Sequence, residues 1–264
     1  MKITVKDIIQ RKKTKEKIVV LTAYDSLFAQ LEEECGVDVL LVGDSLGMVL
    51  LGHSSTVPVT VRDMVHHTKA VSRVTRKSLV VADLPFGSCE QGSEHVVRSA
   101  LRLIKEGGAQ AVKIEGAETR EKEIKALVKA GIPVMGHLGL TPQSSERLGG
   151  YKVQGKQPKE ALQIIKEANL LEKWGAFSIV LECVPSQLAK KITQKISIPT
   201  IGIGAGKDCD GQVLVIYDLL GMGGNSKYRF VREYVNMRSK IKKSINSFIS
   251  DVQTGDFPNK EESF

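Results

Sequence analysis

The chain has 264 residues, of which 42% are apolar and 26% are charged. This composition excludes an intrinsically disordered chain, a collagen-like repeat and a small disulfide-stapled domain. The 38 Lys and Arg residues exceed the 30 Asp and Glu residues, which gives a net charge of +8. A basic balance points to nucleic acid, an acidic surface or an anionic substrate as the partner.

The excess positive charge lies in the flanks of the sequence. Residues 2–17 carry +5 and residues 227–243 carry +6, residues 244–264 carry −3, and residues 18–226 carry no net charge. Only 5% of the residues are aromatic, whereas a nucleic-acid-binding module interleaves aromatic with basic side chains. We therefore expect neither nucleic acid nor a membrane as a partner, and we expect a small-molecule substrate.

Two features predict a cytoplasmic location. The basic stretch 11–17 is not followed by the apolar run of a secretory signal, and no window approaches 18 uninterrupted apolar residues. The four cysteines, Cys35, Cys89, Cys183 and Cys209, are scattered and form no CxxC pair. Scattered cysteines are typical of reduced thiols in a cytosolic protein, although the sequence leaves a single bridge open.

Short apolar runs and amphipathic segments alternate along the chain. Eight runs predict strands, at residues 18–22, 39–42, 79–82, 111–114, 133–136, 178–181, 200–203 and 213–216. Between most of them, helical spacing predicts helices at 26–35, 61–76, 93–106, 118–130, 159–174 and 186–195. Apolar runs without alternation are typical of strands that are covered on both faces, as in a parallel sheet.

Eight such strands with helical crossovers predict an α/β fold, a (β/α)8 TIM barrel. A doubly wound open sheet is the alternative, but no strand is followed by a GxGxxG turn and a helix. The seven residues 205–211 are too few for a full crossover helix, which makes this the weakest join of the barrel. We expect one domain over residues 1–264, with a basic N-terminal segment and a C-terminal helical tail.

Polar residues follow most of the predicted strands, where the catalytic residues of a barrel stand. They are Asp25, Asp44 with Ser45, Asp83, Lys113 with Glu115, His137, Glu182, and the glycine loop 204–206. Each Asp or Ser alone could simply cap the next helix. Several carboxylates on one rim repel one another, however, and Mg²⁺ is the cation that suits two or three carboxylates and water. The sequence therefore predicts a Mg²⁺ site at this rim.

Three further features carry hypotheses with open alternatives. Lys113 and Glu115 share one face of a strand, so that Lys113 could neutralise a substrate oxyanion or form a structural ion pair. Glu182 ends an apolar run and is a candidate general base. The polar, glycine-rich segment 141–158 has the length of a lid, or is a tolerated insertion. The adjacent His66 and His67 lack zinc-ligand spacing and are expected on a helix flank.

Taken together, nine segments resemble the ketopantoate hydroxymethyltransferase family. They are LTAYD (21–25), LLVGDSLGMV (40–49), VTVRDMVHHTKAV (59–71), ADLPF (82–86), VKIEG (112–116), GHLGLTPQS (136–144), GGYKVQGK (149–156), VLECVP (180–185) and IPTIGIGAG (198–206). The resemblance implies a barrel of the phosphoenolpyruvate/pyruvate type. It also implies transfer of a hydroxymethyl group from 5,10-methylenetetrahydrofolate to 3-methyl-2-oxobutanoate, which gives 2-dehydropantoate in the first step of pantothenate synthesis.

The resemblance assigns roles by matching positions. It implies Asp44 and Asp83 as Mg²⁺ ligands, with Glu115 as a further acid at the metal, and Glu182 as the proton acceptor. The residues that it implies in contact with the 2-oxo acid are Asp44, Ser45, Asp83 and Lys113, and His137 is implied to line the site. One Mg²⁺ per subunit and a large homo-oligomer, commonly a decamer, are also implied.

Three positions depart from the family pattern. Ser54 stands where members usually carry Asp, residues 72–78 lack a usual Gly-Ala-Pro, and Ala117 replaces a second glycine. None of these departures removes a residue with an implied role. The alternative function is another Mg²⁺-dependent enzyme of the same barrel superfamily, which makes or breaks a C–C or P–C bond of a different 2-oxo acid.

Overall fold

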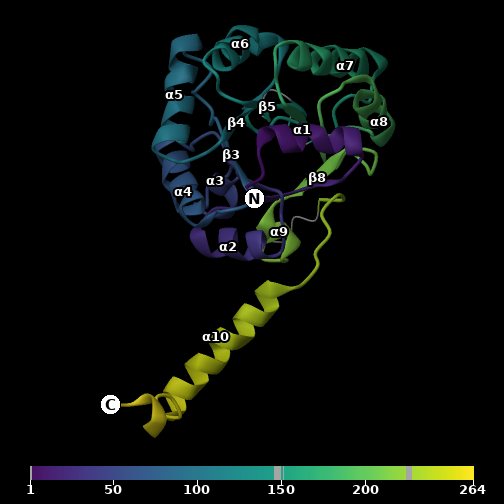
Figure 1. The fold of residues 1–264 in the computed structure, drawn as a ribbon. Helices are drawn as coiled ribbons and strands as arrows, with labels where there is room; N and C mark the ends of the chain where they lie inside the picture. Colours follow the sequence, from purple (N-terminus) through teal and green to yellow (C-terminus); the bar gives the residue numbers. More distant parts are fainter. Residues whose placement is uncertain (1, 146–149, 151, 224–227) are drawn as a thin grey trace. The chain divides into compact units, whose positions relative to one another are not determined.

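A computed structural model describes residues 2–145, 150, 152–223 and 228–264. Eight parallel strands close into a barrel in sequence order, each paired with its neighbours and β8 with β1, as predicted. They are β1 (Ile18–Thr22), β2 (Val39–Val42), β3 (Leu79–Asp83), β4 (Ala111–Glu115), β5 (Val134–Gly139), β6 (Ser178–Glu182), β7 (Thr200–Ile203) and β8 (Gly211–Leu214). Figure 1 shows the helices arranged around this ring of strands.

The helices of the barrel part lie around the strands, apart from α1, which lies across one end of the barrel (Figure 1). They are α1 (Val5–Thr14), α2 (Ser26–Glu34), α3 (Leu46–Val49), α4 (Val61–Val74), α5 (Ser93–Lys105), α6 (Glu121–Lys129), α7 (Pro158–Lys173) and α8 (Ser186–Lys195), with 3-10 turns η1 (Glu118–Arg120) and η2 (Pro142–Ser144). The predicted helix over 118–130 is thus a 3-10 turn followed by α6. The remaining predicted helices agree with the structure to within two residues at each end.

The predicted strands differ from the observed ones mainly at their C-terminal ends. Strands β3, β4 and β6 extend one residue further than predicted, and each of these extra residues is charged: Asp83, Glu115 and Glu182. The predicted strands end at the last apolar residue, whereas the parallel pairing with neighbouring strands includes the charged residue that follows it. The prediction of a strand at 213–216 was wrong by two residues, because β8 pairs with β1 and β7 from Gly211 onward.

Alternate side chains of the strands fill the barrel interior. The apolar interior contains Ile18, Val20, Val39, Leu41, Leu79, Val81, Ala111, Met135, Phe177, Val180, Ile201 and Val213. Because side chains alternate along a strand, Asp83, Lys113 and Glu115 continue the inward rows that Val81 and Ala111 begin. The apolar layers therefore occupy the N-terminal part of the barrel, and the charged layer lies at its C-terminal end.

Helix α1 closes the N-terminal end of the barrel (Figure 1). A capping box begins it: the Thr4 hydroxyl accepts from the Asp7 backbone N–H, and the Asp7 carboxylate accepts from the Thr4 N–H. The fully buried Ile8 packs into the interior apolar cluster, with Ile9 alongside. No helix was predicted here, because the basic residues of the segment obscured the apolar spacing at positions 5, 8 and 9.

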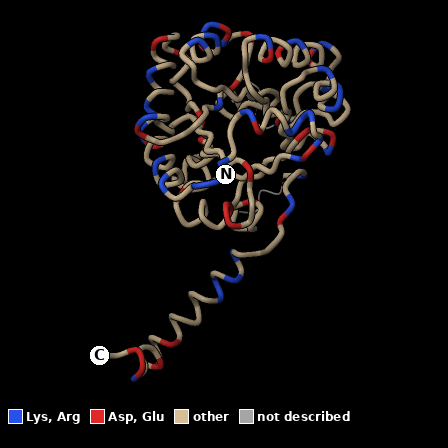
Figure 2. Tube along the Cα trace, viewed as in Figure 1, with Lys and Arg blue, Asp and Glu red and all other residues tan. Residues whose placement is uncertain are grey.

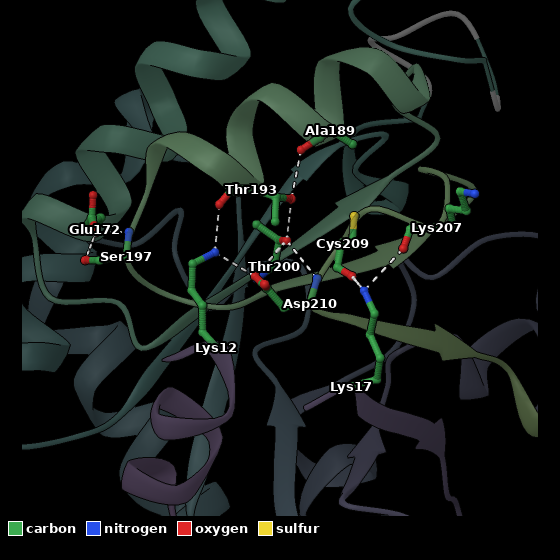
Figure 3. A network of polar contacts seen from close by, with 10 residues as sticks. All are labelled: Lys12, Lys17, Glu172, Ala189, Thr193, Ser197, Thr200, Lys207, Cys209 and Asp210. Carbon is green, nitrogen blue, oxygen red and sulfur yellow. Dashed lines mark hydrogen bonds and ion pairs between the residues drawn. The ribbon is translucent and has the colours of Figure 1, made fainter. Parts of the chain in front are cut away.

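The short connection between β7 and β8 is held by a network of polar contacts (Figure 3). The Asp210 carboxylate accepts from the Thr200 backbone N–H at 2.8 Å and from the Lys12 ammonium of α1 at 2.7 Å. Lys12 also donates to the Thr193 carbonyl at 2.8 Å, and Lys17 donates to the Cys209 carbonyl at 2.5 Å. The seven-residue connection is too short for a crossover helix, and these contacts hold it in place instead. The barrel closes as predicted.

The chain divides into two compact units, residues 1–215 and residues 216–264. The second unit contains α9 (Ile216–Leu219), α10 (Met237–Thr254) and η3 (Lys260–Glu262). Figure 2 shows basic residues in the first half of α10 and acidic residues after it. Across the described residues, there is no helix with the length and apolar character needed to cross a membrane.

Candidate functional site

Strands β3 to β6 bring charged side chains together at the C-terminal end of the barrel. Neighbouring strands pair Asp83 with Lys113 and Glu115 with His137. Four of these side chains are buried, with exposed fractions of 3% for Asp83, 5% for Lys113, 9% for Glu115 and 2% for His137. A charged layer of this kind contributes little to packing and costs free energy through desolvation, so its position marks a candidate active site.

Two carboxylates and one lysine form the first part of the site. The Asp83 carboxylate accepts from the Asp44 backbone N–H at 3.1 Å through Oδ2. Its other oxygen, Oδ1, is 3.1 Å from Lys113 Nζ, in an ion pair without hydrogen-bond geometry. Asp44 lies two residues after the end of β2 and is 3% exposed. The Asp44 backbone is thereby fixed to the Asp83 side chain across two adjacent strands.

His137 forms the second part of the site. Its Nε2 lies 3.2 Å from Glu182 Oε2, and its Nδ1 lies 3.2 Å from Lys113 Nζ and 3.5 Å from Glu115 Oε1. The Nε2 contact with Glu182 is an ion-pair distance without hydrogen-bond geometry, and the ring lies between Glu182 on one side and Lys113 and Glu115 on the other. His137 therefore links the lysine and both glutamates into one charged cluster.

The backbone around Glu182 requires a glycine on the adjacent strand. Gly139 pairs with Glu182 and has a φ of +92°. A Cβ at this position would lie 2.2 Å from the Glu182 carbonyl oxygen, which already accepts from the Leu140 N–H at 2.8 Å. A side chain at position 139 would thus displace the backbone of Glu182.

Burial and repulsion perturb the pKa values of the cluster. Burial raises the pKa of Asp44, and the nearby Asp83 and Glu115 carboxylates raise it further. Burial also raises the pKa of Asp83, although Lys113 opposes this. Burial lowers the pKa of Lys113, but the Asp83, Glu115 and Asp44 carboxylates outweigh it and raise the pKa above its usual value. Lys113 is therefore charged, and one ammonium faces three carboxylates.

The pKa of His137 results from opposed effects. Burial and the Lys113 ammonium lower it, whereas the Glu115 and Glu182 carboxylates raise it and outweigh them, so that the pKa is about 9. His137 can therefore hold a proton at neutral pH beside Glu182. Groups that hold or move protons next to one another are typical of acid–base catalysis.

Two residues of the site were missed by sequence reasoning. The Tyr24 hydroxyl lies 2.8 Å from the Ser45 hydroxyl, and Tyr24 is 1% exposed. The Gln143 side chain donates to Asp44 Oδ2 at 2.7 Å and to the Leu84 carbonyl at 2.9 Å. Both residues lie in segments that carry the family resemblance. Their side chains are uncharged and reach the site from other loops, so no pattern of residue types in the sequence indicates them.

Several sequence predictions fall elsewhere in the structure. Asp25, one of the strand-end acids, caps α2 by accepting from the Phe28 N–H at 2.9 Å. His67 lies on α4, as expected of a helix flank, and its Nδ1 is 2.7 Å from the Tyr24 carbonyl. Gly206 packs against Ser186 so closely that a Cβ would lie 2.5 Å from its Cβ. The predicted lid 141–158 includes residues 146–149 and 151, which lie outside the described residues.

The donor set fits a hard divalent cation held by two carboxylates. Within the described residues, no group of three or more His, Cys, Asp or Glu side chains is arranged to hold a metal ion. Glu115 is engaged by the Gln143 backbone N–H at 3.1 Å and by His137. Asp83 Oδ1 is buried without a hydrogen-bond donor, and Asp44 lies beside it. Mg²⁺ usually takes one or two carboxylates and fills its other positions with water and substrate, which Asp44 and Asp83 satisfy.

Comparison with known proteins gives the family. The model of the family described as ketopantoate hydroxymethyltransferase matches residues 2–260. The chain belongs to this family. The 3-methyl-2-oxobutanoate hydroxymethyltransferase of Caldicellulosiruptor saccharolyticus is 53% identical over 263 residues, which is 100% of this chain and 99% of the relative. That of Syntrophus aciditrophicus is 52% identical over 263 residues, or 100% and 97% of the two chains.

Solved structures confirm the predicted barrel type. A crystal structure of phosphonopyruvate hydrolase with oxalate and Mg²⁺ is 12% identical, with a TM-score of 0.63, and the match covers 98% of this chain and 93% of that one. A structure of 2,3-dimethylmalate lyase, a member of the PEP mutase/isocitrate lyase superfamily, is 15% identical with a TM-score of 0.63, covering 100% and 93%. At such identities these matches show the fold alone. The family match makes this chain an enzyme, and its barrel has the same fold as those structures.

Proposed function

We propose that this enzyme transfers a hydroxymethyl group from 5,10-methylenetetrahydrofolate to C3 of 3-methyl-2-oxobutanoate, which gives 2-dehydropantoate for pantothenate synthesis. The transferred carbon comes from the folate, and its hydroxyl oxygen comes from water. The names of relatives that are about half identical over their full length support the 2-oxo acid substrate. One observation of the site carries the chemistry: Glu182 ends β6 and contacts His137, which on its other side contacts the buried Lys113.

Glu182 is the general base in this proposal. Its carboxylate takes the proton from C3 of the 2-oxo acid, and the electron pair of that C–H bond forms the enolate. His137 supports this role, because its Nε2 lies 3.2 Å from Glu182 Oε2 and its raised pKa places a positive charge beside that side chain. Water adds to the one-carbon unit and the two C–N bonds to the folate break, which leaves tetrahydrofolate and a one-carbon carbonyl. The enolate carbon attacks that carbonyl carbon, the C–C bond forms as the C=O π bond opens, and the resulting oxyanion takes the proton back from Glu182 to become the hydroxyl group of the product.

Lys113 and the aspartates bind and orient the 2-oxo acid. The Lys113 ammonium lies inside the barrel and offsets negative charge on the substrate carboxylate and on the enolate oxygen. Ser45, oriented by the Tyr24 hydroxyl, is a further donor to the substrate. Asp44 and Asp83 would hold one Mg²⁺, with Glu115 close by and acting through water. The cation, when bound, supplies Lewis-acid polarisation of the keto oxygen.

The proposal is tested by product formation. The wild-type chain is incubated with 3-methyl-2-oxobutanoate and 5,10-methylenetetrahydrofolate, with and without Mg²⁺, and 2-dehydropantoate is measured. We expect product only when the folate is present and much less after removal of Mg²⁺. Folate-independent turnover of the 2-oxo acid would instead indicate the alternative, another bond-making or bond-breaking enzyme of this barrel superfamily.

The role of Glu182 is tested without the folate. In deuterated water, the wild type is expected to exchange the C3 proton of the 2-oxo acid, and Glu182→Gln is expected to lose this exchange by about 10²–10⁴-fold. Glu167→Gln is a matched control, because Glu167 is also half-buried but lies on the outer helix α7. Undiminished exchange in Glu182→Gln would remove Glu182 from the base role.

The assembly and the location of the chain are also proposals. We propose a homo-oligomer, with a decamer as the specific expectation. Support comes from the apolar side chains along α10, which is described without a buried residue: Ile241, Ile245, Phe248, Ile249 and Val252. The mass of the assembled full chain in solution tests this.

A cytoplasmic location is supported by the four free cysteines, which a reducing compartment would maintain.

A further inference from the structure

Gln143 contacts residues from three other segments of the candidate site. It lies in η2, directly after β5, and its Nε2 donates to Asp44 Oδ2 at 2.7 Å and to the Leu84 carbonyl at 2.9 Å. Its backbone N–H donates to Glu115 Oε2 at 3.1 Å. One residue thus connects the loops that follow β2 and β3 with the end of β4.

The Gln143 side chain uses both hydrogens of its amide nitrogen in these contacts. Asp44 Oδ2 and the Leu84 carbonyl oxygen are both acceptors, so the group between them must donate two hydrogens from one atom. The backbone of η2 presents this amide in a fixed position, because the Ser144 N–H donates to the Thr141 carbonyl at 2.8 Å. Asp44 is held at two points: Gln143 donates to its Oδ2, and its own backbone N–H donates to Asp83 Oδ2.

We propose that Gln143 is a positioning residue, which holds the Asp44 carboxylate in the orientation that binds the cation and the 2-oxo acid. This inference rests on the proposed function, since it takes from there that Asp44 binds Mg²⁺ and the 2-oxo acid. Gln143 acts through Asp44 and need not touch the substrate. Outer partners that orient a ligating carboxylate typically change metal affinity or activity by about 10–100-fold when they are removed.

The chain contains a matched control. Gln163 lies on α7, is half-buried like Gln143, and donates through Nε2 to Glu118 at 2.7 Å and to Glu167 at 3.1 Å. It makes the same kind of contact on the outside of the barrel. The two glutamines therefore separate loss of a hydrogen-bonded amide in general from loss of the amide that holds Asp44.

The test compares Gln143→Met with Gln163→Met in the full-length chain. Methionine keeps the length and approximate volume of glutamine and removes both donors. Mg²⁺ affinity is measured by titration calorimetry in the presence of the 2-oxo acid, and KM and kcat are measured separately. For Gln143→Met we expect the Kd for Mg²⁺ and the KM for the 2-oxo acid each to rise roughly tenfold or more, with a smaller change in kcat. The unfolding temperature should stay within about 2 °C of wild type.

Each outcome decides for or against the positioning role. Equal Kd and KM values in Gln143→Met and wild type would overturn it, and so would an equal loss in Gln163→Met. If Gln143→Met does not fold, Gln143→Asn replaces it, because its amide is one methylene too short to keep both contacts. The calorimetric result is independent of folate. Failure of folate-dependent product formation in the wild type therefore refutes the proposed function without deciding the role of Gln143.

Discussion

The N-terminal and C-terminal ends of the barrel each place an aspartate beside a lysine, but with a different balance of charge. At the N-terminal end, Asp210 accepts from Lys12 and from the Thr200 N–H, and each charge meets its own partners (Figure 3). At the C-terminal end, a single lysine, Lys113, faces several carboxylates, and the pKa of Asp44 is raised by burial and by its acidic neighbours.

The difference shows how one pair of residue types serves two purposes. A partly buried charge that has an ion-pair partner and hydrogen bonds fixes a local structure, as Asp210 fixes the connection of β7 to β8. An excess of negative charge that the protein does not neutralise raises the energy of the empty site, and a bound cation relieves that repulsion. The comparison predicts large effects on activity at one end of the barrel and effects on stability at the other.

The largest effect is expected from removing the lysine at the C-terminal end. Lys113→Met leaves Asp83, Glu115 and Asp44 without their ammonium and removes the positive charge that offsets the enolate. We expect kcat/KM to fall by about 10²–10³-fold, which steady-state kinetics measures. Lys125→Met on α6 is the control, because its pair with Glu121 is exposed. Activity within about threefold of wild type in Lys113→Met would contradict the assigned role.

The next effect tests whether a raised pKa alone marks a functional site. Glu32, on the outer helix α2, is 4% exposed, and within the described residues neither of its carboxylate oxygens has a hydrogen-bond partner. Burial, with a contribution from Asp25, raises its pKa to about 8. The folded chain therefore holds this proton over a range in which the unfolded chain has released it. Stability is highest below the ordinary glutamate pKa and is lost as pH rises from there to about 8.

For Glu32→Gln we expect this loss to disappear. At pH 9 the variant should be more stable than the wild type by roughly 3 kcal/mol in urea unfolding, with the advantage shrinking as pH falls. Activity should not change, since the residue is outside the site. Its neighbour Glu33 is the opposite case: burial opposes ionisation, but hydrogen bonds from the Lys77, Ser78 and Arg76 N–H groups lower its pKa. Glu33→Gln should therefore cost stability above the ordinary glutamate pKa. A pH profile for Glu32→Gln that parallels wild type would refute the account.

These contrasts also show which parts of the molecule the sequence predicts. Apolar runs predicted all eight strands, and the acids Asp44, Asp83 and Glu182 that follow those runs lie at one end of the barrel, because chain order places the strand ends on one rim. Sequence patterns do not reveal Gln143, since its role depends on a contact with Asp44 across 99 positions. For the same reason they do not reveal that α1 closes the barrel.

The smallest effect is expected at the N-terminal end, where Lys12 connects α1 to the β7–β8 connection. Lys12→Met removes the 2.7 Å ion pair with Asp210 and the hydrogen bond to the Thr193 carbonyl. Both charged side chains are mostly buried, so removing one partner leaves the other incompletely compensated, and we expect a loss of about 2 kcal/mol in urea unfolding. Since the charged cluster lies at the opposite end of the barrel, kcat/KM should stay within about twofold of wild type.

Lys190→Met provides the comparison for Lys12→Met. Its ammonium lies 3.9 Å from Asp208, and both side chains are substantially exposed, so the loss should stay below about 0.5 kcal/mol. If Lys12→Met instead lowers kcat/KM by more than about tenfold while its unfolding curve matches wild type, the division between a stabilising and a catalytic end is wrong. If it loses stability and keeps its activity, the network around Asp210 supports the barrel that positions the catalytic layer, without taking part in the chemistry.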